Sequence, residues 1–164
     1  MKFHVENRIL ADRDAVQAAY LDPAFYSAMV DMPKISPPEV VGREEQGDVI
    51  LMKVRYRFSG DLPPAARRVL DPDKLTWVNE STVDLAEHRT EFRMVPDNYG
   101  NRIRFGGTYR FEQVDAATVQ VIEGDLVVRY PIVGPLVERA ILSGMREHLE
   151  QEAAFLEQWT ASTR

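Results

Sequence analysis

The sequence predicts an α+β fold in which a curved antiparallel sheet wraps around one long C-terminal helix. Segments between about residues 35 and 128 alternate apolar and polar residues and are separated by turn residues, which indicates hairpins with one buried and one solvated face. The segment 131–159 instead places apolar residues at helical spacing, and such a helix needs a sheet to cover its apolar stripe. We therefore expect one domain over residues 1–164.

The first thirty residues predict one strand and two short helices. Residues 2–9 roughly alternate apolar and polar side chains, which favours a strand. Asp12 is a good N-cap for a helix that follows it. Asp22 and Pro23 restart a second helix, with Asp as the cap and Pro at the first helical position, and we expect this helix to extend through Val30. The two helices should close one end of the sheet.

The middle of the chain predicts a run of strands at residues 49–58, 76–85, 90–94, 102–114 and 119–128. Residues 97–101 and the pair Asp115-Ala116 have the composition of hairpin turns. Gly106 and Gly107 lie inside the fourth of these strands. We interpret them as a bend that curves the sheet, with a local bulge as the alternative.

The C-terminal helix should start near Gly134-Pro135. Its apolar stripe contains Val137, Ile141, Met145, Leu149, Phe155 and Trp159. At about 1.5–3 kcal/mol for each side chain, burial of this stripe amounts to roughly 9–18 kcal/mol before opposing terms. The helix must therefore lie on the sheet.

Two segments of the chain resemble a known superfamily. Residues 11–25 (ADRDAVQAAYLDPAF) look like the beginning of START-like, helix-grip (SRPBCC) proteins, which include the birch pollen allergen and the polyketide cyclases. Residues 124–138 (GDLVVRYPIVGPLVE), together with 61–64 and 75–77, resemble an uncharacterised domain-of-unknown-function family (2505) within it. The resemblance implies a helix-grip fold over nearly the whole chain. It carries no catalytic residue over, because this superfamily hosts many unrelated functions.

Composition narrows the function classes. The chain has no Cys, its three His show no metal-ligand spacing, and no phosphate-binding loop is visible, so we expect no metal and no cofactor. The net charge of -6 argues against a nucleic-acid binder. We find no signal peptide, no lipidation motif and no apolar run of about 20 residues, which predicts a cytoplasmic protein without integral membrane association. The oligomeric state stays open.

A helix held by a curved sheet often leaves an internal cavity, which is the default ligand site. The inward faces of the strands and the helix predict a lining of Met52, Val54, Tyr56, Trp77, Phe92, Met94, Phe105, Tyr109, Phe111, Ile141, Met145, His148 and Glu152. The alternative is a filled core, since aromatic and Met stripes are common in both.

His148 and Glu152 are the polar members of this set. They lie four residues apart, so they are neighbours on one helix face, and the carboxylate is able to fix the imidazole tautomer. Such a pair can anchor a ligand hydroxyl or carboxylate, or act as a general base. A pair at the cavity rim without chemistry is the alternative.

Two surface features complete the analysis. The loop 59–74 contains a rigid turn and a short helical stretch, and it could cap the cavity mouth, with Arg67 or Arg68 attracting an anionic head group. A solvated surface loop is the alternative. A row of arginines on the outer sheet face is expected to be solvated and interleaved with Glu; it comprises Arg55, Arg57, Arg102, Arg104 and Arg110.

The sequence therefore predicts a protein that binds or transports a small hydrophobic or amphipathic ligand, lipid-like or polycyclic, in an internal cavity. One alternative is an enzyme similar to polyketide cyclases and dehydratases, in which His148 would be essential. A second alternative is a non-catalytic protein-interaction module with a filled core. The sequence leaves open whether the protein is an enzyme.

Overall fold

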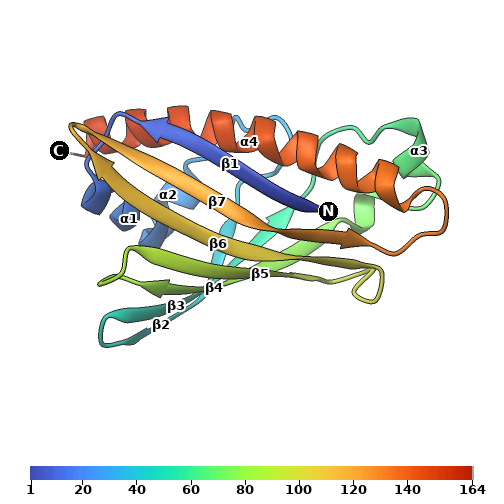
Figure 1. Ribbon diagram of the computed structural model, residues 1–164, viewed down its shortest axis with the longest axis horizontal. Coiled ribbons are helices and arrows are strands. Elements are labelled where there is room, and N and C mark those ends of the chain that lie inside the picture. The colour runs from blue at the N-terminus through green and yellow to red at the C-terminus, as the bar shows by residue number, and fades with distance from the viewer. Residues whose placement is uncertain (164) are drawn as a thin grey trace.

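The computed structural model describes residues 1–163 and shows one seven-stranded sheet with a long helix lying along it (Figure 1). The strands are β1 (Lys2–Ile9), β2 (Glu39–Gln46), β3 (Val49–Arg57), β4 (Thr76–Asp84), β5 (Arg89–Pro96), β6 (Ile103–Val114) and β7 (Ala117–Val128). The helices are α1 (Arg13–Leu21), α2 (Pro23–Ser27), α3 (Pro64–Arg67) and α4 (Gly134–Ser162), with a short 3-10 turn at Pro72–Lys74.

The predicted α+β architecture is confirmed. The strands lie in the order β1-β7-β6-β5-β4-β3-β2, and each neighbouring pair is antiparallel. Strand β1 returns to the far edge beside β7. Helix α4 runs along the sheet, with α1 and α2 at one end and α3 at the other (Figure 1).

The sequence predicted most of the elements, but it placed the end of α2 wrongly and missed strand β2. The Asp22 carboxylate caps α2 by accepting the backbone N–H of Ala24 at 2.9 Å. This helix ends at Ser27 rather than reaching Val30, which is 64% exposed. Strand β2 was not predicted, because its mostly exposed edge residues show little alternation between buried and solvated side chains.

The sheet bends where glycines of two strands face each other. Gly107 pairs with Gly124, and a Cβ atom on either would lie well under 3.0 Å from backbone atoms of the neighbouring strand. Only residues without a side chain permit this close approach. The β6–β7 register runs without a shift from Ile103 to Val114, so the bend is made by close packing, and the bulge alternative is wrong.

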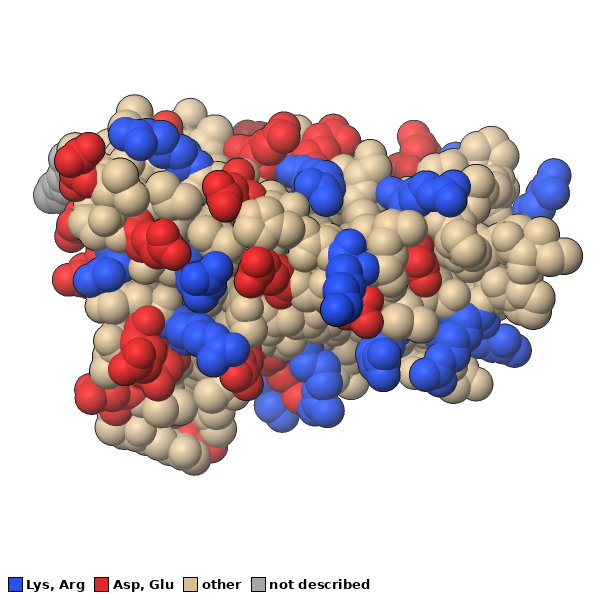
Figure 2. Space-filling model, viewed as in Figure 1, with Lys and Arg blue, Asp and Glu red and all other residues tan. Residues whose placement is uncertain are grey.

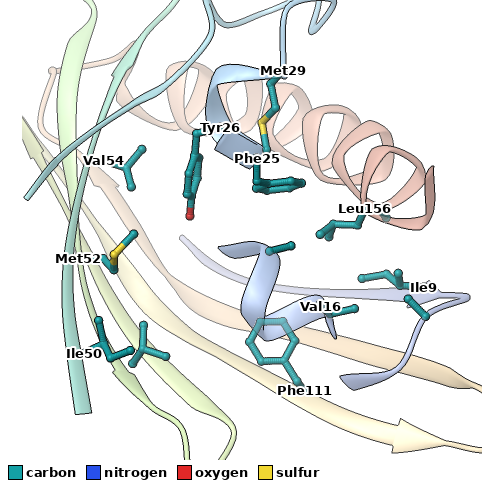
Figure 3. Close-up of a cluster of buried hydrophobic side chains, with 14 residues drawn as sticks. Ile9, Val16, Phe25, Tyr26, Met29, Ile50, Met52, Val54, Phe111 and Leu156 are labelled. Atoms are coloured by element: carbon teal, nitrogen blue, oxygen red, sulfur yellow. The ribbon is translucent and has the colours of Figure 1, made fainter. Parts of the chain in front are cut away.

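The core consists of two clusters. The first packs α1, α2 and the end of α4 against β3 and β6, and Figure 3 shows Tyr26 extending from α2 toward Met52 and Val54. The second lies under the first half of α4 and includes α3. The most buried side of α4 is centred on Leu142, Leu149 and Leu156, while the predicted stripe members Ile141, Met145, Phe155 and Trp159 are half-buried along its edges.

Candidate functional site

A small cavity lies between the sheet and the helices of the first cluster. Its walls come from α1 (Gln17, Tyr20), α2 (Tyr26), β3 (Met52, Val54, Tyr56), β4 (Asn79, Ser81, Val83), β5 (Thr90), β6 (Tyr109, Phe111) and α4 (Glu152). Its volume is about 60 Å³. Since one water needs about 10–15 Å³ by this measure, the cavity has room for a few waters. Pockets for drug-sized ligands are larger, about 300–1,000 Å³.

The structure brings six of the thirteen predicted lining residues to this cavity, namely Met52, Val54, Tyr56, Tyr109, Phe111 and Glu152. Trp77 does not line the cavity; it lies beside Tyr56 on the neighbouring strand, with the two rings stacked at 5.6 Å and an interplanar angle of 5°. Phe92, Met94, Phe105, Ile141 and Met145 do not line this cavity and pack in the second cluster. His148 contacts Glu152 rather than the cavity.

Sequence reasoning predicted Glu152, Tyr56 and Tyr109 but missed six other polar residues of the wall, namely Gln17, Tyr20, Tyr26, Asn79, Ser81 and Thr90. A signal for two of them was available. Asn79 and Ser81 occur in phase with Trp77 and Val83, so the alternation that points Val83 inward also points these polar side chains inward.

The buried carboxylate of Glu152 is the polar centre of the site. The Tyr20 hydroxyl donates a hydrogen bond to one oxygen at 2.5 Å, and the His148 Nε2 lies 3.2 Å from the other. The Gln120 amide donates to the Tyr20 hydroxyl at 2.8 Å, and the Asn7 amide lies 3.3 Å from the Gln120 carbonyl. Four elements, α1, α4, β1 and β7, thus fix the position of this carboxylate.

Two buried nitrogen atoms near this network have no hydrogen-bond partner among residues 1–163. One is the Gln17 Nε2, whose side-chain oxygen faces the His88 Nδ1 at 2.5 Å. The other is the His148 Nδ1. An unpaired buried polar group costs about 1–3 kcal/mol. The Gln17 amide therefore offers an unused donor at the cavity wall.

The tyrosines around the cavity remain protonated far above neutral pH. Burial raises the pKa of Tyr20, Tyr26 and Tyr56 well above the usual range, and the negative charge of Glu152 adds to each shift. Burial, followed by the charge of Glu152, also raises the pKa of Tyr109. The cavity thus presents neutral hydroxyls and one carboxyl group to a ligand.

The loop 59–74 does not border this cavity. Ala66 and Leu70 pack into the second cluster at the opposite end, and the Arg67 guanidinium lies 3.4 Å from Asp61. Its predicted role as a cavity cap is therefore wrong, because α3 covers the start of α4. Among residues 1–163, no three His, Cys, Asp or Glu side chains are grouped to hold a metal ion. No helix in the same range is long and apolar enough to cross a membrane.

The arginines predicted on the outer sheet face are partly matched by carboxylates. Arg55 lies 2.7 Å from Asp97, and Arg110 lies 3.5 Å from Glu112 and 3.7 Å from Glu123. These pairs are exposed, and exposed pairs contribute about 0–1 kcal/mol to stability. The half of the sheet that carries them is a solvated face with mixed charge.

Comparisons with known proteins agree with this architecture. TTHA0849 from Thermus thermophilus has a similar structure, with 21% identity over 99% of each chain and a TM-score of 0.67. The Zhui aromatase/cyclase from Streptomyces matches with 17% identity, 100% of this chain, 97% of that chain and a TM-score of 0.65. A norcoclaurine synthase mutant from Thalictrum matches with 16% identity over 94% of each chain and a TM-score of 0.59.

At these identities the structural matches establish the fold alone. A search of curated protein sequences finds no match. A family model described as "protein of unknown function (DUF2505)" matches residues 4–160, almost the whole chain. The chain therefore belongs to the DUF2505 family and has a helix-grip fold, in which a curved antiparallel sheet holds a long C-terminal helix.

Proposed function

We propose that this protein binds a small hydrophobic or amphipathic ligand in the cavity between the sheet and α1, α2 and α4. The observation that carries the proposal is the unpaired Gln17 Nε2 at the wall of a cavity that is otherwise rich in aromatic and apolar side chains. Apolar walls with a few convergent polar groups are typical of ligand sites. If this region served stability alone, pairing the Gln17 donor or replacing it with an apolar group would make the fold more stable.

The ligand makes two kinds of contact in this proposal. Met52, Val54 and Phe111 cover its apolar part, and desolvation of that part supplies most of the affinity at about 25 cal/mol per Å². The Gln17 amide donates to an oxygen of the ligand, and the carboxylate of Glu152 accepts from a hydroxyl. These two anchors set the orientation of the ligand.

Binding requires the cavity to open, since about 60 Å³ is too small for a polycyclic or lipid-like molecule. The short helix α2 is the wall best suited to move. It has five residues, and it places Tyr26 between the cavity and the rest of the first cluster. Displacement of Tyr26 enlarges the cavity without breaking the strand pairing of the sheet.

Calorimetric titration with 1-naphthol, a neutral bicyclic molecule with one hydroxyl group, tests the proposal. The wild type should bind it, and Val54→Phe should weaken binding because the larger side chain occupies the cavity. Gln17→Leu should weaken binding through loss of the anchor. Leu10→Ser is a surface control, because Leu10 is exposed and does not line the cavity. Absence of binding to the wild type, or equal binding by Val54→Phe, would contradict the proposal.

The second candidate is an enzyme that cyclises or dehydrates a polyketide-like substrate. The specific observation in its favour is the Glu152 carboxylate, which lines the cavity and accepts a hydrogen bond from Tyr20. In this role Glu152 is the general base and His148 holds it in place. His148→Ala should then abolish turnover of a poly-β-carbonyl substrate, whereas a ligand carrier should lose only a little affinity.

A further inference from the structure

A basic recess lies on the outer surface where strands β5 and β6 separate. Strands β5 and β6 pair only as far as Met94 and Phe105, although β5 continues to Pro96 and β6 begins at Ile103. The separated strand ends leave a recess of about 370 Å³. Its charged lining consists of Arg93, Arg102, Arg104, Arg129 and one carboxylate, Glu80.

The positive charge of the recess is largely unmatched. Glu80 is already paired with Arg93 at 2.6 Å and with Lys53 at 3.8 Å. The carboxylate nearest to Arg104 is 4.0 Å away, on Asp125.

Of the remaining two arginines, Arg102 is held by uncharged groups. Arg102 donates to the carbonyl of Arg129 at 3.0 Å and lies 5.2 Å above the ring of Tyr130. Neither Arg102 nor Arg129 forms an ion pair within the described chain. The charge of Arg102 is therefore held in place, and both charges are available to an anion.

Acidic and basic side chains are concentrated at different ends of the molecule (Figure 2). Figure 2 shows acidic side chains gathered near the β2–β3 turn, which carries Glu44, Glu45 and Asp48, and Lys and Arg side chains toward the opposite end. A protein with a net charge of -6 is repelled by an anionic surface as a whole. This distribution turns the recess toward such a surface and the acidic end away from it.

A strained apolar side chain stands beside the recess. Ile132 has a φ of 70°, and the N–H of Val133 donates to the carbonyl of Pro131 at 2.8 Å, so Ile132 is the central residue of a tight three-residue turn. A β-branched residue is strained in this conformation. Ile132 is also 99% exposed, and Leu136 nearby is 46% exposed.

No packing explains an isoleucine at this position, because its side chain contacts solvent. Glycine or asparagine would make the same turn with less strain. Strained backbone at an exposed site is a recurrent feature of functional positions. Arg129 lines the recess and Arg102 contacts both Arg129 and Tyr130, so the turn at Ile132 follows directly from the edge of the recess.

We propose that this surface, the basic tip formed by Arg93, Arg102, Arg104, Arg129, Ile132 and Leu136, binds the surface of an anionic lipid bilayer. The arginines contact the phosphate groups of the lipids, and Ile132 and Leu136 enter the layer beneath the head groups. A protein partner fits less well, because stable protein interfaces bury about 800 Å² on each side around an apolar centre, and here only Val95, Ile132 and Leu136 are exposed large apolar side chains among charged ones.

Flotation with lipid vesicles at moderate salt tests this proposal. The protein should float with vesicles of phosphatidylcholine and phosphatidylserine, should not float with phosphatidylcholine alone, and should be released by high salt. Ile132→Ser should lower the affinity about tenfold. The double substitution Arg104→Gln and Arg129→Gln should lower it by about 25-fold, at about fivefold for each charge.

Two matched controls lie at the other end of the molecule. Leu10→Ser removes an apolar side chain that is 62% exposed, and Arg43→Gln removes an exposed arginine near the β2–β3 turn. Both should float like the wild type. The proposal is overturned if the wild type does not bind anionic vesicles, if it binds both vesicle types equally, if either control loses as much affinity as its partner variant, or if Ile132→Ser binds like the wild type.

Discussion

Raising the pH above about 10 should unfold this protein steeply, because its cavity is ringed by tyrosines that resist ionisation. The pKa of Tyr20, Tyr26, Tyr56 and Tyr109 is raised in the folded state, chiefly by burial. In the unfolded chain each phenol ionises near its ordinary value of about 10. Below that pH both states are protonated, and the contribution of these groups to stability is fully present.

Above pH 10 the unfolded state loses protons that the folded state keeps, so stability falls as the pH rises. The fall is about 1.4 kcal/mol per pH unit for each tyrosine, and about 5.5 kcal/mol per pH unit for four. A domain with about 5–15 kcal/mol of stability should then unfold between roughly pH 11 and 13.

Circular dichroism and phenolate absorbance, recorded on the same samples, provide the assay. The two signals should change together, because ionisation of the cavity tyrosines accompanies unfolding. Tyr109→Phe should reduce the slope of stability against pH by about 1.4 kcal/mol per pH unit, as measured by denaturant unfolding at several pH values. If all tyrosines ionise near pH 10 while the circular dichroism signal stays native, the inferred burial of these hydroxyls is refuted.

Five further substitutions at four positions have expected effects on stability that denaturant or thermal unfolding can measure. Gly107→Ala should lower the free energy of unfolding by about 3 kcal/mol or more, because the new methyl group meets backbone atoms of β7. Gly144→Ala in α4 meets only ordinary contacts and should raise Tm by about 2–4 °C. Equal effects of the two substitutions would contradict the role of the bend. Ile132→Gly should stabilise the fold by about 0.5–1 kcal/mol, because relief of the strained turn exceeds the entropy cost of glycine. A loss of stability would show that the Ile132 side chain packs against the rest of the protein. Glu152→Gln should change the free energy of unfolding by less than about 1 kcal/mol, because the amide oxygen still accepts from the Tyr20 hydroxyl. Glu152→Ala should lower it by about 3 kcal/mol, because the buried Tyr20 hydroxyl then has no acceptor. Equal effects of the two substitutions would argue against the hydrogen bond.

The sequence predicted the elements whose signals are local. Strand β1 was expected at residues 2–9 and lies at Lys2–Ile9, and the long helix begins at Gly134 as its Gly-Pro pair indicated. The hairpin turn at Asp115 lies where its composition placed it. The stop of α2 at Ser27 was missed because Met29 is buried outside the helix and so continues the apolar pattern without continuing the helix.

The cavity was harder to predict because it depends on how the bent sheet distributes one inward face between two clusters. Phe92 and Tyr109 share that face and pack against each other at 4.8 Å, yet only Tyr109 reaches the cavity. Alternation fixes which side of the sheet a residue faces, but not whether α4 or the short helices lie opposite it. Gln17 was missed for a similar reason, because its burial comes from contact between α1 and the sheet.

Methionine methyl NMR tests the central claim of ligand binding in this cavity most directly. Met52 lines the cavity, whereas Met94 and Met145 pack in the second cluster. When 1-naphthol is added to protein labelled at its methionine methyl groups, the signal of Met52 should shift in a saturable way while those of Met94 and Met145 stay in place. A saturable shift confined to Met94 or Met145, or no shift of Met52 at any concentration of the probe, would contradict the account.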